Sequence, residues 1–189
     1  PNAVQYHSPR FGGVQVQVEW APSEQTVPAV APATNTVKND GMGVAIRYDG
    51  GPLSASVTSY KGASTATSTA KNKAVTQLAA AYDLGMAKVF FTHRDQGGMA
   101  SDADTSYALG VTAPVGPGSL YASYNVNEQA GDDGKTIIAG YKYSFSKRTT
   151  AYVNFANRNK TWLNASVVAS GGTANKSSNG FGVGLQHNF

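Results

Sequence analysis

The 189-residue sequence has no cysteine, little charge and no long hydrophobic run. Without cysteine there is no disulfide scaffold, no thiolate metal site and no cysteine nucleophile. Charged residues make up 14% of the chain, whereas soluble domains carry about 25%. The longest apolar stretch, Leu78 to Tyr82, is far shorter than the roughly 18 residues that a membrane-spanning helix needs. The sequence therefore excludes transmembrane helices, and its polarity comes from neutral side chains.

Motifs of catalysis, metal binding and nucleic-acid binding are also missing. The sequence has no Gly-x-Ser-x-Gly elbow, no phosphate-binding glycine loop and no His-Glu-x-x-His motif. His7, His93 and His187 have no second ligand at metal spacing. The net charge is +4, but the lysines and arginines form no cluster with interleaved aromatics. We therefore expect no enzyme, no metal or cofactor, and no nucleic-acid partner.

A period of two runs along the whole chain. Near the C-terminus, apolar Phe181, Val183, Leu185 and Phe189 alternate with small or polar residues, and only an extended strand turns this pattern into two different faces. A helix is the alternative for the alanine-rich residues 75–84. The alternation predicts an all-β chain of about eleven strands, at residues 2–8, 14–20, 42–49, 53–61, 74–83, 86–95, 104–113, 119–127, 135–145, 149–158 and 180–189.

The predicted connections alternate in length. Short segments with turn-forming residues lie at 9–12, 50–52, 84–85, 114–118 and 146–148. Long polar loops lie at 21–40, 62–73, 96–103, 128–134 and 159–178. Short turns on one side and long loops on the other are typical of an antiparallel up-and-down β-barrel that spans an outer membrane.

Charge placement agrees with a transmembrane barrel, in which an ionised side chain facing lipid at mid-depth costs about 2 to 4 kcal/mol. Three charged residues fall on the apolar face, Lys61, Asp95 and Lys135, and all three lie at strand ends beside long loops. Eight charged residues fall on the polar face: basic Arg47, Lys88, Arg94, Lys142 and Arg158, and acidic Glu19, Asp49 and Asp83.

Aromatic residues also favour a barrel, because an interfacial girdle belongs at the ends of membrane strands. Five aromatics lie at short-turn strand ends: Tyr48, Tyr82, Tyr143, Phe145 and Phe189. The alternative is a soluble or surface all-β sandwich, which would be a binding or adhesin module with long recognition loops.

Both ends of the chain resemble one known family. The ending Gly184-Leu185-Gln186-His187-Asn188-Phe189 resembles the closing strand of general porins of Gram-negative outer membranes. The opening, from Asn2 to Gly13, resembles the Asn-x-hydrophobic-x-Tyr-x-Ser-Pro-x-Phe-x-Gly hairpin found inside such porins, particularly those of beta-proteobacterial type.

The resemblance implies a barrel of about 16 strands in the cell outer membrane, with the lipid bilayer as partner and a homotrimer as its assembly. In such a barrel Phe189 ends a descending strand, and counting back eleven strands makes the first one descend too. We therefore expect residues 1–189 to be the C-terminal part of a single barrel domain. About five strands, a signal peptide and the inward-folded loop that narrows the pore would precede Pro1.

The function implied by the resemblance is passive diffusion of small hydrophilic solutes and ions through a water-filled channel, with no bond made or broken. Phe181, Val183, Leu185 and Phe189 would form the C-terminal signal that closes the barrel. Weak anion selectivity would follow from the charge of the wall, to which we assign as pore-lining residues Arg47, Lys88, Arg94, Lys142, Arg158, Glu19 and Asp49, with Asp83 opposing them locally.

Overall fold

The computed structural model describes residues 2–22, 37–62, 64–66, 74–95, 103–129, 133–159 and 177–188. These residues form β-strands joined by turns, and none of them is helical. The strands are β1 (Val4–His7), β2 (Val14–Ala21), β3 (Val37–Asn39), β4 (Gly41–Gly50), β5 (Leu53–Lys61), β6 (Ser64–Ala66), β7 (Val75–Asp83), β8 (Lys88–Asp95), β9 (Ala103–Val115), β10 (Gly118–Gln129), β11 (Gly134–Ser144), β12 (Thr149–Arg158) and β13 (Ser178–His187).

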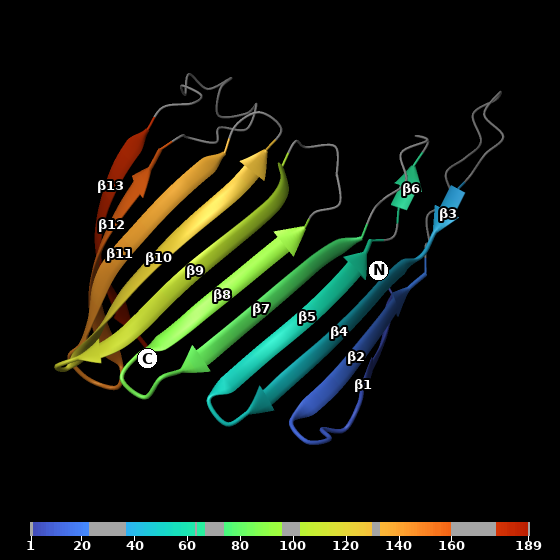
Figure 1. Ribbon diagram of the computed structural model, residues 1–189, viewed down its shortest axis with the longest axis horizontal. Coiled ribbons are helices and arrows are strands. Elements are labelled where there is room, and N and C mark those ends of the chain that lie inside the picture. Colours follow the sequence, from blue (N-terminus) through green and yellow to red (C-terminus); the bar gives the residue numbers. More distant parts are fainter. Residues whose placement is uncertain are drawn as a thin grey trace.

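Eleven of the described strands form one antiparallel sheet in the order β1-β2-β4-β5-β7-β8-β9-β10-β11-β12-β13. Within this sheet, each strand pairs with the strand before it and the strand after it, and β3 and β6 form a separate pair. This is the up-and-down topology that the sequence predicts. Figure 1 shows the short turns together at one end of the strands and the long connections at the other. β1 and β13 are the two edges, so these eleven strands do not close on themselves.

The short turns are tight because glycine supplies backbone conformations that other residues rarely adopt. Gly51 and Gly85 have φ angles of +54° and +83°, in the left-handed region that glycine enters without steric cost. Gly85 also donates its backbone N–H to the Asp83 carboxylate, over 2.8 Å. These short turns therefore determine the register of the two strands that each of them joins.

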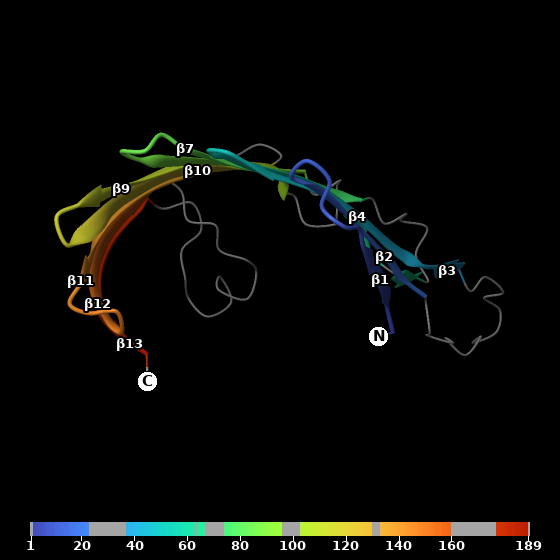
Figure 2. The ribbon, with the colours of Figure 1, turned by 90° about the horizontal axis from the view of Figure 1, so that it is seen from below.

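The sheet is a single curved layer, as Figure 2 shows. Among the described residues only Ala21 and Val126 are buried hydrophobics, whereas most large apolar side chains are exposed. A soluble sandwich would cover its apolar face with a second sheet, because that face is its core. No second layer covers the described part of this sheet, so the architecture is not a sandwich.

The strand predicted at residues 74–83 is confirmed as β7, so its helical alternative is wrong. Two other points differ from the prediction. Several boundaries move by one to two residues: β9 and β10 are longer than predicted because they continue to pair with each other, whereas β1 and β8 are shorter. The short pair β3 and β6 was not predicted and joins two segments expected as loops. No helix among the described residues is long and apolar enough to cross a membrane.

Candidate functional site on the polar face of the sheet

The register of the sheet joins the polar residues of all eleven strands into one face. Paired residues share a face, because side chains directly opposite each other in antiparallel strands point the same way. Arg47 of β4 and Arg158 of β12 belong to one such row, and the residues between them are Ser56, Ala79, Thr92, Ala108, Asn125 and Thr136.

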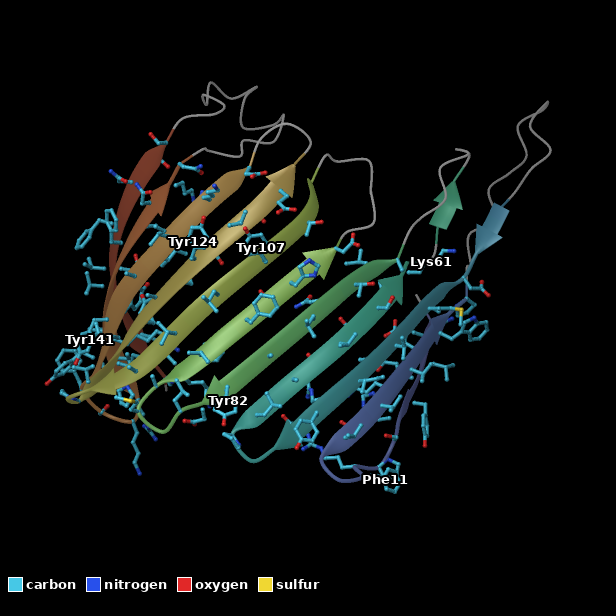
Figure 3. The ribbon with its side chains drawn as sticks, viewed as in Figure 1. Phe11, Lys61, Tyr82, Tyr107, Tyr124 and Tyr141 are labelled. Atoms are coloured by element: carbon cyan, nitrogen blue, oxygen red, sulfur yellow. The ribbon has the colours of Figure 1, made fainter. Side chains whose placement is uncertain are left out.

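The apolar face is the convex one. Figure 3 views the sheet from its convex side, and the labelled Tyr82, Tyr107, Tyr124 and Tyr141 belong to the apolar set of their strands. Tyr107 and Tyr124 lie towards the long connections, whereas Tyr82 and Tyr141 lie towards the short turns. The convex face therefore has an aromatic residue group near each end of its strands, and the polar face is concave.

All eight charged residues assigned to the polar pattern lie on this concave face. The pairings connect Arg47 to Gln15, Arg94 to Gln77, Arg158 to Thr136 and Lys142 to Ser119. Lys88 pairs with Asp83, Asp49 with Ser54, and Glu19 with Gln5. Five bases and three acids share the face, which gives it a net charge of about +2 before the turns are considered.

Contacts between charged groups divide the basic residues into two classes. The Lys88 ammonium lies 3.7 Å from the Asp83 carboxylate, so this cation has an acidic partner. Asp49 lies 3.2 Å from the guanidinium of Arg10 in the first turn. Among the described residues the remaining four bases, Arg47, Arg94, Lys142 and Arg158, have no carboxylate within salt-bridge distance. These four side chains are exposed and carry the uncompensated charge of the face.

Two further contacts orient charged side chains on the concave face. The Lys142 ammonium lies over the Tyr121 ring, 5.5 Å from its centroid, in a cation–π arrangement. The Glu19 carboxylate accepts a hydrogen bond of 2.7 Å from the Gln5 amide. Lys142 is thereby held against the wall, and Glu19 keeps its negative charge beside β1.

Three tyrosines on the concave face each lie across from a glycine of the neighbouring strand. The pairs are Tyr60 with Gly43, Tyr121 with Gly140 and Tyr152 with Gly184. A Cβ added at any of these glycines would meet the tyrosine ring closer than ordinary van der Waals contact. The glycines make room for rings that lie flat against the wall. These pairs cannot be predicted from the sequence alone, because they depend on the register between neighbouring strands.

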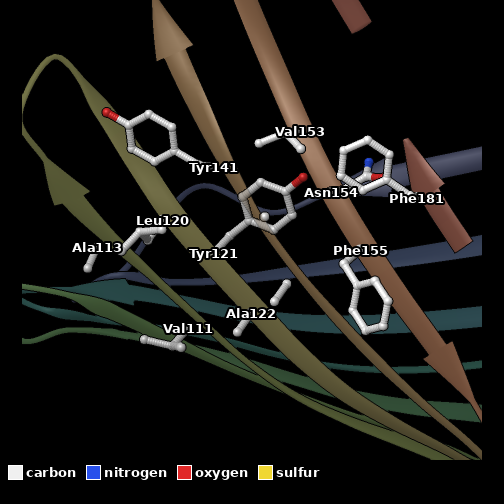
Figure 4. Close-up of a pocket in the computed structure, with 12 residues that line it drawn as sticks. Val111, Ala113, Leu120, Tyr121, Ala122, Tyr141, Val153, Asn154, Phe155 and Phe181 are labelled. Carbon is white, nitrogen blue, oxygen red and sulfur yellow. The ribbon is translucent and has the colours of Figure 1, made fainter. Parts of the chain in front are cut away.

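The apolar face carries a groove in its convex surface. It has a volume of about 470 Å³ and is lined mainly by side chains from β9 to β13, shown in Figure 4. Ala122 of β10 pairs with Ala139 of the adjacent strand β11, and larger side chains such as Tyr141 and Phe155 surround the two alanines. The groove is open because two alanines meet among bulky neighbours.

The remaining predicted positions fall as follows. Phe181, Val183 and Leu185 share the apolar face of β13 and are 73%, 71% and 66% exposed. Phe189 lies outside the described residues. Lys61 and Lys135 lie on the apolar face at the ends of their strands next to long connections, as does Asp95. In the part of the chain that the structure describes, no three acidic or histidine side chains gather into a metal-binding group.

Antiparallel strands in up-and-down order, one polar and one apolar face and aromatic groups at both strand ends define the wall of an outer-membrane β-barrel. The family model of Gram-negative porins matches residues 1–164, and the chain belongs to that family. The chain is 32% identical to outer membrane porin protein 32 of Delftia acidovorans, over all of its own length and 56% of that protein. Family and relative place it in the outer membrane.

Solved structures agree on the fold. The anion-selective porin from Comamonas acidovorans superposes with a TM-score of 0.75 at 30% identity, over 100% of this chain and 59% of that one. OmpT of Vibrio cholerae matches with a TM-score of 0.61 at 16% identity, over 98% of this chain and 63% of that one. The chain thus spans little more than half the length of these proteins.

Proposed function

We propose that the eleven strands form part of the wall of a water-filled channel that lets small hydrophilic solutes and ions diffuse passively across the outer membrane, with a weak preference for anions. The proposal is carried by the register, in which Arg47, Lys88, Arg94, Lys142 and Arg158 share the concave face, whereas the convex face is apolar apart from charged residues at strand ends. Apolar groups outside and charged groups inside suit a barrel with lipid around it and water within it.

The anion preference is supported by the four bases that lack an acidic partner among the described residues. Positive charge on a pore wall raises the local concentration of anions and lowers that of cations. The similar porin from Comamonas acidovorans is anion-selective, which agrees with this sign. Because the charges are spread over β4, β8, β11 and β12, we expect a weak preference distributed along the wall.

Closure of the barrel requires strands beyond the eleven described here, since β1 and β13 each present an unpaired edge. We propose that the chain is the C-terminal portion of one barrel domain of about 16 strands, with about five strands contributed by the same polypeptide. We further propose that three such barrels associate. Cross-linking of the full-length protein in outer membranes tests the trimer, and dimers or monomers alone would contradict it.

The channel is tested with the full-length protein in a planar bilayer under a salt gradient. Stepwise conductance increases are expected, and the reversal potential should have the sign of anion preference. Cation preference would retain the channel but remove the role assigned to the basic residues. Absence of any conductance from correctly folded protein in lipid would overturn the proposed function.

A matched pair of double variants tests the role of the concave face. Arg94→Gln with Arg158→Gln removes two charges near the long connections from the concave face, and the reversal potential should move towards zero. Lys61→Gln with Lys135→Gln removes two charges at the same ends of the strands from the convex face. The second variant has the same net charge, so an equal shift from both would show that the faces are assigned wrongly.

A further inference from the structure

Phe90 interrupts the polar character of the concave face. It is the one phenylalanine on that face among the described strands, and it is 39% exposed. Its partners in register are Ala81 of β7 and Gly110 of β9, so the wall on both sides of it is small and apolar. A single exposed aromatic ring is ordinary on a protein surface, so its meaning depends on the groups that it meets in the wall.

Phe90 lines one side of a hollow of about 220 Å³ in the concave wall. Ala79 and Ala81 form the floor of this hollow, and Arg47 lies at its opposite side. Ser54, Ser56 and Thr92 add hydroxyl groups to the lining. The hollow therefore presents an aromatic ring, methyl groups and a guanidinium within one small concave surface.

Arg47 is free to bind an anion at this hollow. The nearby Asp49 also lines it, but the Asp49 carboxylate is engaged by Arg10 at 3.2 Å. Among the described residues Arg47 forms no ion pair, and its side chain is exposed. A guanidinium with no carboxylate partner binds carboxylates in a planar, two-bonded geometry.

We infer that this hollow is a weak binding site for small planar organic anions, of which benzoate is the simplest probe. The carboxylate would accept hydrogen bonds from Arg47, while the ring would pack against Phe90 and over the alanine methyl groups. The inference rests on the proposed function, since it requires the concave face to line the solute path. Weak binding suits a channel, because a bound solute must also leave.

The charge of the site selects this ligand class over neutral sugars. A sugar is recognised by several hydrogen-bonding partners, whereas this hollow offers the Arg47 guanidinium, an Asp49 carboxylate already engaged by Arg10, hydroxyls and a mostly apolar surface. Acetate has the charge of benzoate but no ring, so it separates the contribution of Phe90 from that of Arg47.

The test measures chloride current through the full-length protein in a planar bilayer while sodium benzoate is added to both sides. Saturable inhibition by benzoate is expected, and acetate at the same concentrations should inhibit much less. Arg47→Gln and Phe90→Ala should each raise the half-inhibitory benzoate concentration at least about fivefold. Phe90→Leu, which keeps the volume but removes the aromatic ring, should give a smaller increase in the same direction.

Arg158→Gln is the matched control, because Arg158 lies in the same row of paired residues as Arg47 but does not line the hollow. It removes one charge and should shift the half-inhibitory concentration less than twofold. Equal shifts from Arg47→Gln and Arg158→Gln would overturn the site and leave only a general effect of wall charge.

Two further outcomes separate this inference from the proposed function. An anion-preferring channel without saturable benzoate inhibition would overturn the binding site and leave the channel intact. A Phe90→Ala variant that loses heat stability while retaining the benzoate response would also overturn it, since Phe90 would then pack against another part of the protein. No conductance at all would overturn the channel itself.

Discussion

Ala139 and Gly140 are neighbours on β11 that are small for opposite reasons. Ala139 points to the convex face, where it pairs with Ala122 and leaves a groove of about 470 Å³. Gly140 points to the concave face, where the Tyr121 ring occupies the space that a side chain would need. The small side chain of Ala139 leaves a groove open, whereas the absence of a side chain at Gly140 makes room for the Tyr121 ring.

The difference shows how each face of the wall meets its surroundings. On the convex face, lipid chains can occupy a groove, because they adapt to any apolar surface. On the concave face, exposing apolar surface to water is unfavourable, and tyrosine rings cover the glycines there. Tolerance to added side-chain volume should therefore differ sharply between two adjacent positions, whereas tolerance to charge should differ in the opposite sense.

Adding charge at Ala139 gives the largest expected effect. Ala139→Arg places a guanidinium in the middle of β11 facing lipid, which costs about 2 to 4 kcal/mol of unfolding free energy. Reversible denaturant unfolding in phospholipid vesicles measures it. Ala156→Arg is the control, because Ala156 lies on the concave face of β12, and it should lose far less. Equal losses would contradict the assignment of the two faces.

Adding a single methyl group at Gly140 comes next. Gly140→Ala brings a Cβ against the Tyr121 ring and the Val153 carbonyl oxygen, and the backbone oxygen has little freedom to move. We expect a loss of about 1 to 3 kcal/mol in the same unfolding experiment. Gly180→Ala, on the same face but with no atom within 4 Å of an added Cβ, should be near neutral. If both variants are neutral, the Tyr121 ring is not fixed over Gly140.

Removing the cation above Tyr121 separates two ways of holding the ring. Lys142→Gln abolishes the cation–π contact and should cost about 0.5 to 1 kcal/mol if the ammonium helps to fix Tyr121. High salt should leave most of this difference in place. Lys61→Gln, which removes a charge from the other face, serves as the reference. A loss as large as that of Gly140→Ala would mean that lysine, rather than glycine, determines the ring position.

Adding apolar volume at Ala139 should have the smallest effect. Ala139→Leu fills part of the groove with hydrocarbon that replaces lipid hydrocarbon, so we expect a change of about 0.5 kcal/mol or less. This larger addition should therefore cost less than the single methyl group at Gly140. A loss above that of Gly140→Ala would show that the groove is occupied by protein.

The fold followed from the sequence because the period of two is a local property. Strands β5 and β12 have the predicted bounds, and the alternation alone assigns each charged residue to a face. The β3 and β6 pair escaped detection, since each has only three residues and neither shows sustained alternation. Their pairing depends on how two long connections approach each other, which no local pattern encodes.

The sequence predicts which charged residues lie on the concave face, but it does not predict which of them contact each other. The five bases could be placed on one face from their parity. No local pattern indicates that Arg10, in a turn, engages Asp49, or that Phe90 of β8 and Arg47 of β4 line one hollow. Such contacts depend on register and curvature across several strands. The Asp83 and Lys88 pair was accessible, because the two residues flank a tight turn.

The almost continuous register of the sheet limits which insertions and deletions its strands can accept. The pairings of the eleven-stranded sheet carry one irregularity, between Glu128 and Gln129 at the end of β10 next to a long connection. Because residues alternate between lipid and water, insertion of one residue within a strand exchanges the environments of every residue beyond it. Insertions and deletions within the strands should therefore be accepted in pairs of residues, whereas the long connections should accept any number.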